Sequence, residues 1–237
     1  MTPSTVTQPA KEPAKADELP LLAALLLLTF STGLIDAVSV LGLGRVFTAN
    51  MTGNIVFLGF AVAGTPGLSV TRSLASLGMF IAGAIGGGRL AKAMASHSTP
   101  QWLVTAVLTE GGFLLAAALA AIGFDASAEN HSAVLYAAIA LTAVAMGLRN
   151  ATVRRLGVPD LTTTVLTLTL TGIAADSSLA GGTNLRISRR LASVCLMFTG
   201  AALGALLLRF GLAVPLAVSG AVALISAALL STTSPAR

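Results

Sequence analysis

The sequence predicts an all-α membrane protein built from two halves, each with about four membrane-embedded helical segments. Hydrophobic residues make up 55% of the 237 residues, charged residues make up 10%, and the mean hydropathy is +0.88. A soluble domain carries about 25% charged residues, so lipid must be the solvent for most of this chain. Apolar runs recur along the chain between short polar breaks, and several motifs return after 114 to 118 residues.

Composition also narrows the class of function. The net charge is +5, but in a membrane protein basic residues mark helix ends, so we expect no nucleic-acid partner. The chain has one cysteine, Cys195, and two histidines, His97 and His131, which are too few for a typical metal site. It contains no Gly-x-x-x-x-Gly-Lys-Ser/Thr loop and no nucleophile elbow. We therefore expect neither enzymatic activity nor a cofactor.

The first half is predicted to span residues 19–123, after a disordered tail at 1–18 that is rich in Pro, Ala and Thr. This tail and the following run do not read as a signal peptide, because further apolar runs follow. A crossing helix needs about 20 apolar residues. Four segments are predicted in this half, the second being ended by Pro66-Gly67: Leu19–Leu43, Val46 to about Gly64, Ser73–Met94 and Trp102–Gly123.

The second half is predicted at 133–231, after a polar connection at 124–132, and it ends in a tail at 232–237. Its second segment is short. Leu161–Ala175 has 15 residues, or about 22 Å of helix, against a hydrocarbon core of about 30 Å. The four segments of this half are Ala133–Asn150, Leu161–Ala175, Leu191–Leu208 and Leu212–Leu230.

An internal repeat relates the two halves. Matching residues indicate a duplication, with loop insertions accounting for the small drift in the shift. Glycines near the middle of the third segment of each half, Gly83, Gly86, Gly87, Gly200 and Gly204, are expected to serve close helix packing. The matches are Gly33-x-x-Asp36-Ala37 with Gly147-x-x-Asn150-Ala151, Thr48 and Thr52 with Thr163 and Thr167, and Arg72 and Met79-Phe80 with Arg190 and Met197-Phe198.

The number of crossings decides how these repeats are oriented. With eight crossings the repeats are parallel. The basic residues then divide six to seven between the two sides of the membrane, with Arg149 left out as intramembrane. If the second segment of each half enters and returns on one side, six crossings remain, the repeats are inverted and the division is ten to three. We favour six crossings, because an excess of Lys and Arg is normal on the cytoplasmic side. Inverted repeats also place broken helices and binding sites at the membrane midplane.

A polar stretch at Phe47–Asn54 lies inside an uncharged run of 26 residues, from Val46 to Thr71. Polar groups at that depth must face protein, water or a ligand. Candidate binding residues follow from this, with hydrogen bonding between helices or to the helix's own backbone as the competing interpretation. They are Asn50, Thr52, Gly53 and Asn54, together with Asn150, Thr163 and Thr167 in the second half.

Charged residues inside the apolar segments are the other candidates. Asp36 is predicted to be a substrate or proton site, or half of a structural ion pair. Arg149 is its candidate counter-charge, unless it lies at the interface and snorkels to the headgroups. Glu110 could couple proton movement through a raised pKa, or pair with an arginine. Asp176 closes the sixth segment and is expected at the interface.

The motifs quoted above resemble the YoaK family of bacterial integral membrane proteins over residues 20 to 230. The resemblance rests on Gly33-x-x-Asp36-Ala37, on Phe47-Thr-Ala-Asn-Met-Thr-Gly-Asn54, and on Met146-Gly-x-x-Asn150-Ala151 with Thr162-Thr-Thr-Val-Leu-Thr167. It implies a membrane protein and adds no substrate. Arg149 and Leu168 depart from the pattern of the family, which would have a Gln-like residue and a glycine there.

Two functions follow as hypotheses. The first is a small secondary transporter or exporter of a small polar or ionic solute, with a midplane site between the repeats. The second is a structural or assembly protein of the membrane, whose polar segments serve helix packing. Either is expected in the inner (plasma) membrane as a multi-pass protein with a cytoplasmic N-terminus. The partner common to both is the lipid bilayer.

Overall fold

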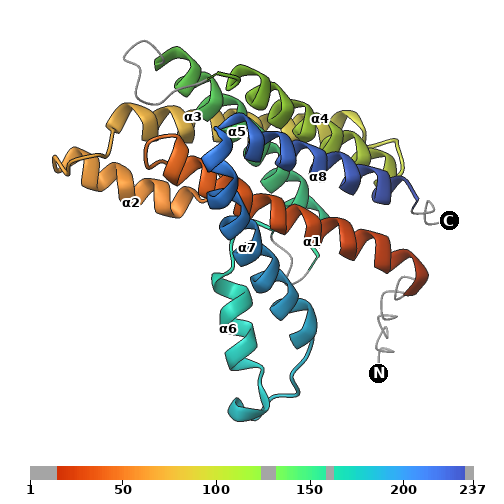
Figure 1. The fold of residues 1–237 in the computed structure, drawn as a ribbon. Helices are drawn as coiled ribbons and strands as arrows, with labels where there is room; N and C mark the ends of the chain where they lie inside the picture. Colours follow the sequence, from red (N-terminus) through yellow and green to blue (C-terminus); the bar gives the residue numbers. More distant parts are fainter. Residues whose placement is uncertain (1–14, 124–131, 159–162, 233–237) are drawn as a thin grey trace, which may run out of the picture.

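The computed structural model describes residues 15–123, 132–158 and 163–232, and it is all-α (Figure 1). Most of the predicted tail at 1–18, most of the predicted tail at 232–237 and most of the predicted connection at 124–132 lie outside these residues. The expectation of disorder is wrong for residues 15–18, which are helical. Helix α1 begins at Lys15, four residues before the predicted first segment. The α-helices are α1 (Lys15–Ala37), α2 (Met51–Val62), α3 (Val70–Ala93), α4 (Thr99–Ala120), α5 (Ser132–Leu156), α6 (Thr167–Ala175), α7 (Ile187–Leu207) and α8 (Ala213–Ser231).

Six of these helices are long and apolar enough to cross a membrane, in the part of the chain that the structure describes. The two others are short: α2 has 12 residues and α6 has 9. At 1.5 Å per residue they are about 18 and 14 Å long, well below the roughly 30 Å of the hydrocarbon core. In the sixth predicted segment, residues 163–166 precede the helix and are not part of it.

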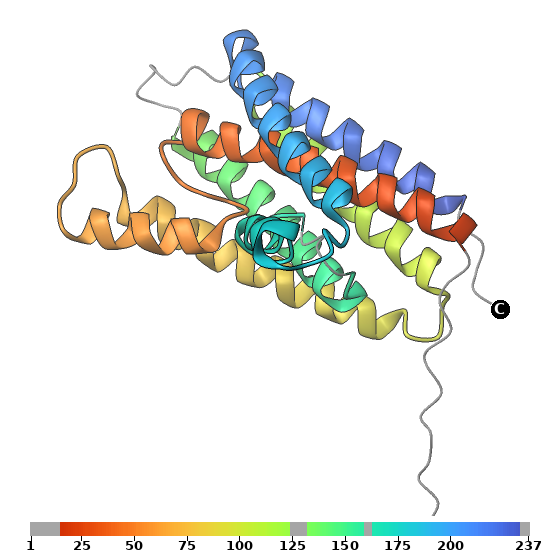
Figure 2. The same ribbon diagram turned by 90° about the horizontal axis from the view of Figure 1, so that it is seen from below.

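The long helices form a continuous series in which each packs on the next. α3 packs against α5, α5 against α4, α4 against α8, α8 against α1, and α1 against α7. The short helix α2 packs against α3, and α6 packs against α7. Figures 1 and 2 show α6 and the first turns of α7 projecting from the rest of the bundle. The core therefore lies among α1, α4, α5 and α8, whereas α3 and α7 keep most of their surface exposed.

Glycines bring the helix backbones together at two crossings. A Cβ atom at Gly33 on α1 would overlap the Met197 carbonyl of α7, and one at Gly200 would overlap the Phe30 carbonyl. At the α3–α5 crossing, Cβ atoms at Gly83 and Gly147 would likewise meet backbone carbonyls. Close approach of this kind is what small residues provide in membrane helix pairs. The expectation for Gly86 is wrong, because it faces open space with nothing within 4 Å.

Helix α1 changes its winding directly after Asp36-Ala37. Residues Val38–Gly42 form the π-helix η1, and the Leu43 amide donates to the Val38 carbonyl at 3.0 Å. π-helical turns are rare and frequently occur at functional sites. The turn that follows leads the chain back toward the bundle, to the polar stretch before α2. Gly44 and Arg45 both have a positive φ here, so the reversal takes place at these two residues.

The glycine crossings give a first prediction. Gly147→Ala adds one methyl group against the Phe80 backbone, which cannot move without separating α3 from α5. We expect it to lower the free energy of unfolding in detergent by about 1–3 kcal/mol. Gly86→Ala is the matched control, because the added Cβ meets nothing and alanine favours the helix by about 0.5–1 kcal/mol. Equal thermal midpoints for the two variants would contradict the packing role.

Candidate functional site

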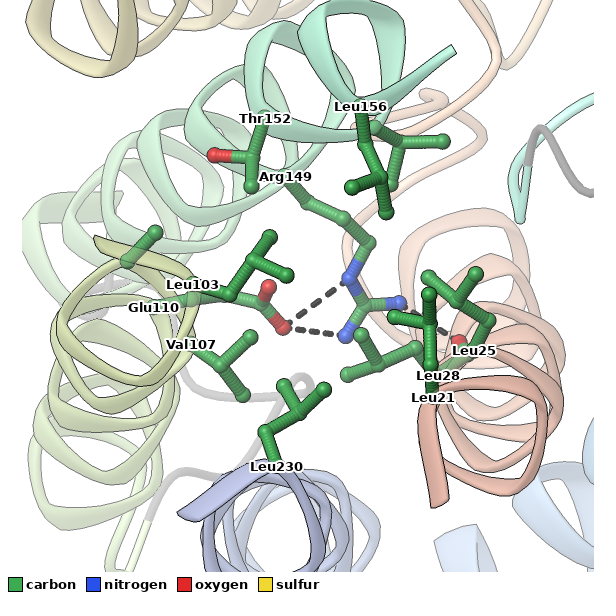
Figure 3. A pocket seen from close by; sticks show the side chains of 12 residues that line it. Leu21, Leu25, Leu28, Leu103, Val107, Glu110, Arg149, Thr152, Leu156 and Leu230 are labelled. Carbon is green, nitrogen blue, oxygen red and sulfur yellow. Dashed lines mark hydrogen bonds and ion pairs between the residues drawn. The ribbon is translucent and has the colours of Figure 1, made fainter. Parts of the chain in front are cut away.

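The side chain of Arg149 lies at the centre of the bundle and is 1% exposed. All of its N–H donors are used. Nε donates to Oε1 of Glu110 at 2.9 Å, and Nη2 donates to the same oxygen and to Ser31 Oγ. Nη1 donates to the Leu28 carbonyl at 2.7 Å and to Thr32 Oγ1 at 2.8 Å. One guanidinium group thus joins α5 to α4 and α1 (Figure 3).

The sequence buries this group by helical periodicity. On each of the three helices, buried residues recur three or four positions apart, so that one stripe faces the shared core. Arg149 and Glu110 each lie on such a stripe, and helix α5 continues to Leu156, beyond the predicted end at Asn150. Arg149 is therefore a core residue and not an interfacial one. The stripes are 25, 28, 32 and 35 in α1, 103, 107, 110 and 114 in α4, and 139, 142, 146, 149 and 153 in α5.

The ion pair leaves no room for a solute. Glu110 is 1% exposed, and the cavity beside the pair has a volume of about 10 Å³. That is about the space one water molecule needs. Leucine and valine side chains such as Leu21, Leu103 and Val107 line most of it (Figure 3). Every guanidinium donor of this pair is used, and the bonds join α5 to α4 and α1.

Asp36 has a different environment. It lies one helical turn beyond Thr32 on α1, so it is on the side of the helix that bears the Arg149 network. Its Oδ1 atom is buried and has no hydrogen-bond partner among the described residues. Arg149 pairs with Glu110, and within the described residues no ion pair joins Arg149 directly to Asp36.

The polar stretch before α2 is held against the first turns of α3. Ser76 Oγ donates to the Phe47 carbonyl at 2.6 Å, and Asn54 Nδ2 donates to the Ser73 carbonyl at 3.1 Å. Asn50 caps α2, its side chain accepting from the Gly53 amide at 3.1 Å. Thr52, in contrast, is exposed. Two oxygens of the stretch, Thr48 Oγ1 and Asn54 Oδ1, are buried without a partner in the described structure.

The stretch before α6 lies against α5. Asn150 Nδ2 donates to its own helix at Met146, and Asn150 Oδ1 accepts from Thr164 Oγ1 at 2.7 Å. Thr163 has a φ of 58°, in the left-handed region, and its buried Oγ1 has no partner among the residues described. Thr167, at the start of α6, is exposed, as Thr52 is. Of the predicted site residues in this half, Asn150 and Thr163 are thus near each other and Thr167 is turned away.

Sequence reasoning missed Ser31, Thr32 and Thr164 as partners of the predicted residues. Ser31 and Thr32 lie one turn before Asp36, which was the available signal, and Thr164 belongs to the Thr162–Thr164 run. Asp176 is 49% exposed at the end of α6 and pairs with Arg190 at 2.7 Å. Arg190 Nη1 also donates to the Gly172 carbonyl at 2.6 Å, which fixes α6 to α7.

Comparisons with known proteins agree with the membrane architecture. A family model described as "Protein of unknown function (DUF1275)" matches residues 24–229. The UPF0700 transmembrane protein YoaK of Bacillus subtilis (strain 168) is 34% identical over 152 residues, which are 64% of this chain and 65% of that protein. The match thus covers slightly less than two thirds of the relative. No solved structure matches the chain.

The buried pair gives a second prediction. Glu110→Leu leaves the Arg149 charge without its counter-ion, so we expect a loss of about 3–5 kcal/mol of stability in detergent. Adding Arg149→Met removes the uncompensated charge and should recover most of that loss. Asp176→Asn, at a carboxylate that is 49% exposed, should cost less, about 1 kcal/mol. A double variant as unstable as Glu110→Leu alone would show that the charges do not act as a pair.

Proposed function

The chain belongs to the DUF1275 family and is a multi-pass membrane protein, and from this we propose that it is a secondary transporter of a small polar or ionic solute. One observation carries the proposal: the Oδ1 atom of Asp36 is buried and lacks a partner among the described residues. A carboxylate in an apolar protein interior costs at least a few kcal/mol unless something compensates it. A proton or a solute that donates hydrogen bonds would supply that compensation.

The proposed site lies between two inverted repeats. In the repeat, α1 to α4 correspond to α5 to α8 in order. When each helix is replaced by its counterpart, the contact α1–α7 becomes α5–α3, α1–α8 becomes α5–α4, and α2–α3 becomes α6–α7, and all of these contacts are observed. The glycine contacts in the two halves also correspond to each other. Gly204 lies against Leu34 and Ala37, and Gly87 lies against Leu148 and Ala151, the residues found at a shift of 114. These correspondences support a duplication.

The repeat also accounts for the Asp36 oxygen that has no partner among the described residues. Asp36 corresponds to Asn150, whose side chain accepts from Thr164. At a shift of 115, Thr164 corresponds to Ala49, which has no hydroxyl to donate. The first half thus retains the acceptor without the donor that the second half provides. Evolution of one half toward ligand binding and of the other toward a fixed structure fits this difference.

The short helices α2 and α6 are proposed to be re-entrant. The polar stretch before each is bonded part-way along a long helix, Phe47 to Ser76 on α3 and Thr164 to Asn150 on α5. Their N-termini carry partial positive charge, which transporters with broken helices use at the midplane. With six crossings, the basic residues divide ten to three, which favours a cytoplasmic N-terminus in the inner (plasma) membrane.

The competing function is a structural or assembly protein of the membrane. The observation that favours it is the Arg149 network, in which every guanidinium donor is used beside a cavity of about 10 Å³. A dry, fully bonded core of this kind serves packing. The two functions differ at Asp36, since packing gives its unpartnered oxygen no role.

Asp36→Asn tests the proposal in proteoliposomes. Pulses of sodium, potassium, ammonium or chloride salts, with an entrapped pH-sensitive dye, report solute-linked proton movement. We expect the variant to fall to the level of protein-free liposomes because its amide cannot release a proton, while its thermal midpoint moves by no more than about 4 °C. Asp176→Asn, outside the proposed site, should keep the wild-type flux. A variant that loses stability and leaves flux unchanged would support the structural alternative.

The re-entrant arrangement predicts the sidedness of two loops. In a Cys195→Ala background, Thr65→Cys and Leu179→Cys place thiols after α2 and after α6; Leu179 is 99% exposed. With six crossings, an impermeant maleimide added to intact cells should label position 65, and position 179 should react only after the membrane is opened. With eight crossings both positions lie on the same side. Labelling of both from one side would overturn the inverted repeat.

A further inference from the structure

We propose that a hollow between the ends of α3, α4 and α5 binds the phosphate of an anionic phospholipid. It has a volume of about 280 Å³ and lies where α3 ends, α4 begins and α5 ends. Figure 2 shows these three helix ends at the same end of the bundle. The residues that could recognise a phosphate there are His97, Thr99, Trp102 and Arg155.

Trp102 is the first element of the proposed site. Its side chain lines the hollow and the residue is only 7% exposed, yet its indole Nε1 is buried and has no acceptor among the described residues. An indole N–H usually finds a partner when buried. A phosphate oxygen in the hollow would supply the missing acceptor.

Arg155 is the second element. Its guanidinium lies 5.8 Å from the centre of the Trp102 ring, and no carboxylate within the described ranges pairs with it. The stretches that form the hollow add positive charge only, since residues 89–109 and 131–159 contain no Asp or Glu. Lys92 and Arg154 lie in the last turns of α3 and α5. The charge beside the hollow therefore favours an anion.

The location favours a lipid over a soluble anion. Tryptophan and basic residues at the ends of membrane helices lie at the level of the lipid headgroups. The rest of the wall is formed by apolar side chains, which suit the glycerol and upper acyl carbons of a lipid: Ala91, Met94, Ala95 and Leu156. The partner we infer is thus a phospholipid with net negative charge, bound by Arg155 and the Trp102 N–H.

Trp102 is the only tryptophan of the chain, so its fluorescence reports on this site alone. The full chain is reconstituted in phosphatidylcholine bilayers that contain increasing fractions of brominated phosphatidylglycerol or brominated phosphatidylcholine. We expect brominated phosphatidylglycerol to quench the Trp102 fluorescence at lower fractions than brominated phosphatidylcholine, by an amount that corresponds to about fivefold tighter binding. Equal quenching by the two lipids would overturn the proposal.

Arg155→Gln should remove this preference, and Arg154→Gln is the matched control. Arg154 carries the same charge one position earlier and does not line the hollow. If both variants reduce the preference equally, the effect is a general surface potential and the site is refuted. Inorganic phosphate, titrated into the phosphatidylcholine sample, distinguishes the two sources of phosphate. If it changes the Trp102 fluorescence and abolishes the lipid preference, the hollow binds a soluble phosphate and the lipid assignment fails.

The indole N–H has its own test, because Trp102→Phe keeps a ring beside Arg155 and removes the donor. Phosphatidylglycerol should raise the thermal midpoint of the wild type above its value in phosphatidylcholine, and the rise should be smaller in Trp102→Phe. The comparison is made within each variant, so a general loss of stability does not affect it. An undiminished rise would show that the N–H does not contribute.

Discussion

A charged group inside a membrane protein must find all its hydrogen-bond partners within the protein, and Arg149 meets this requirement. Its partners come from α1 and α4, so the position of three long helices depends on one side chain of α5. Hydrocarbon offers no substitute for any of these partners. The glycine crossings then determine how closely α3 and α7 approach this core. Together the two constraints explain why α1, α4 and α5 lie in the interior while α3 and α7 lie at its sides.

The two intramembrane acids have opposite environments, although both lie near Arg149. The Glu110 carboxylate takes up the arginine charge in a space that admits at most one water. Asp36 lies one turn beyond the network, next to a π-helical turn, with a buried oxygen that lacks a partner in the described structure. One acid is bonded to the arginine within the bundle, and one oxygen of the other has no partner among the described residues. This division is the physical basis for seeking a function at Asp36 and a scaffold at Glu110.

Local sequence signals predicted much of the fold. Apolar length marked α6 as short, whereas the predicted segment that contains α2, Val46 to about Gly64, was as long as several of the spanning ones. Glycine spacing marked the crossings at Gly83 and Gly200, although it did not tell which glycines face a neighbour. The site was harder to predict. Glu110 and Arg149 are 39 residues apart, and nothing local to either names the other. Thr52 belongs to a pattern in which every second residue is polar. Because an α-helix begins at Met51, side chains from there on follow the helical period of 3.6 residues, and the Thr52 side chain is exposed.

The partners of Arg149 also bear on the biogenesis of the protein. An arginine at the centre of an isolated helix costs about 2.5–3.5 kcal/mol during insertion by the translocon. Its partners on α1 and α4 are synthesised first, because both helices precede α5 in the chain. The first four helices thus act as a template on which the fifth can partition into the bilayer with its charge already neutralised. Glu110 is therefore synthesised before Arg149, the residue whose charge it neutralises.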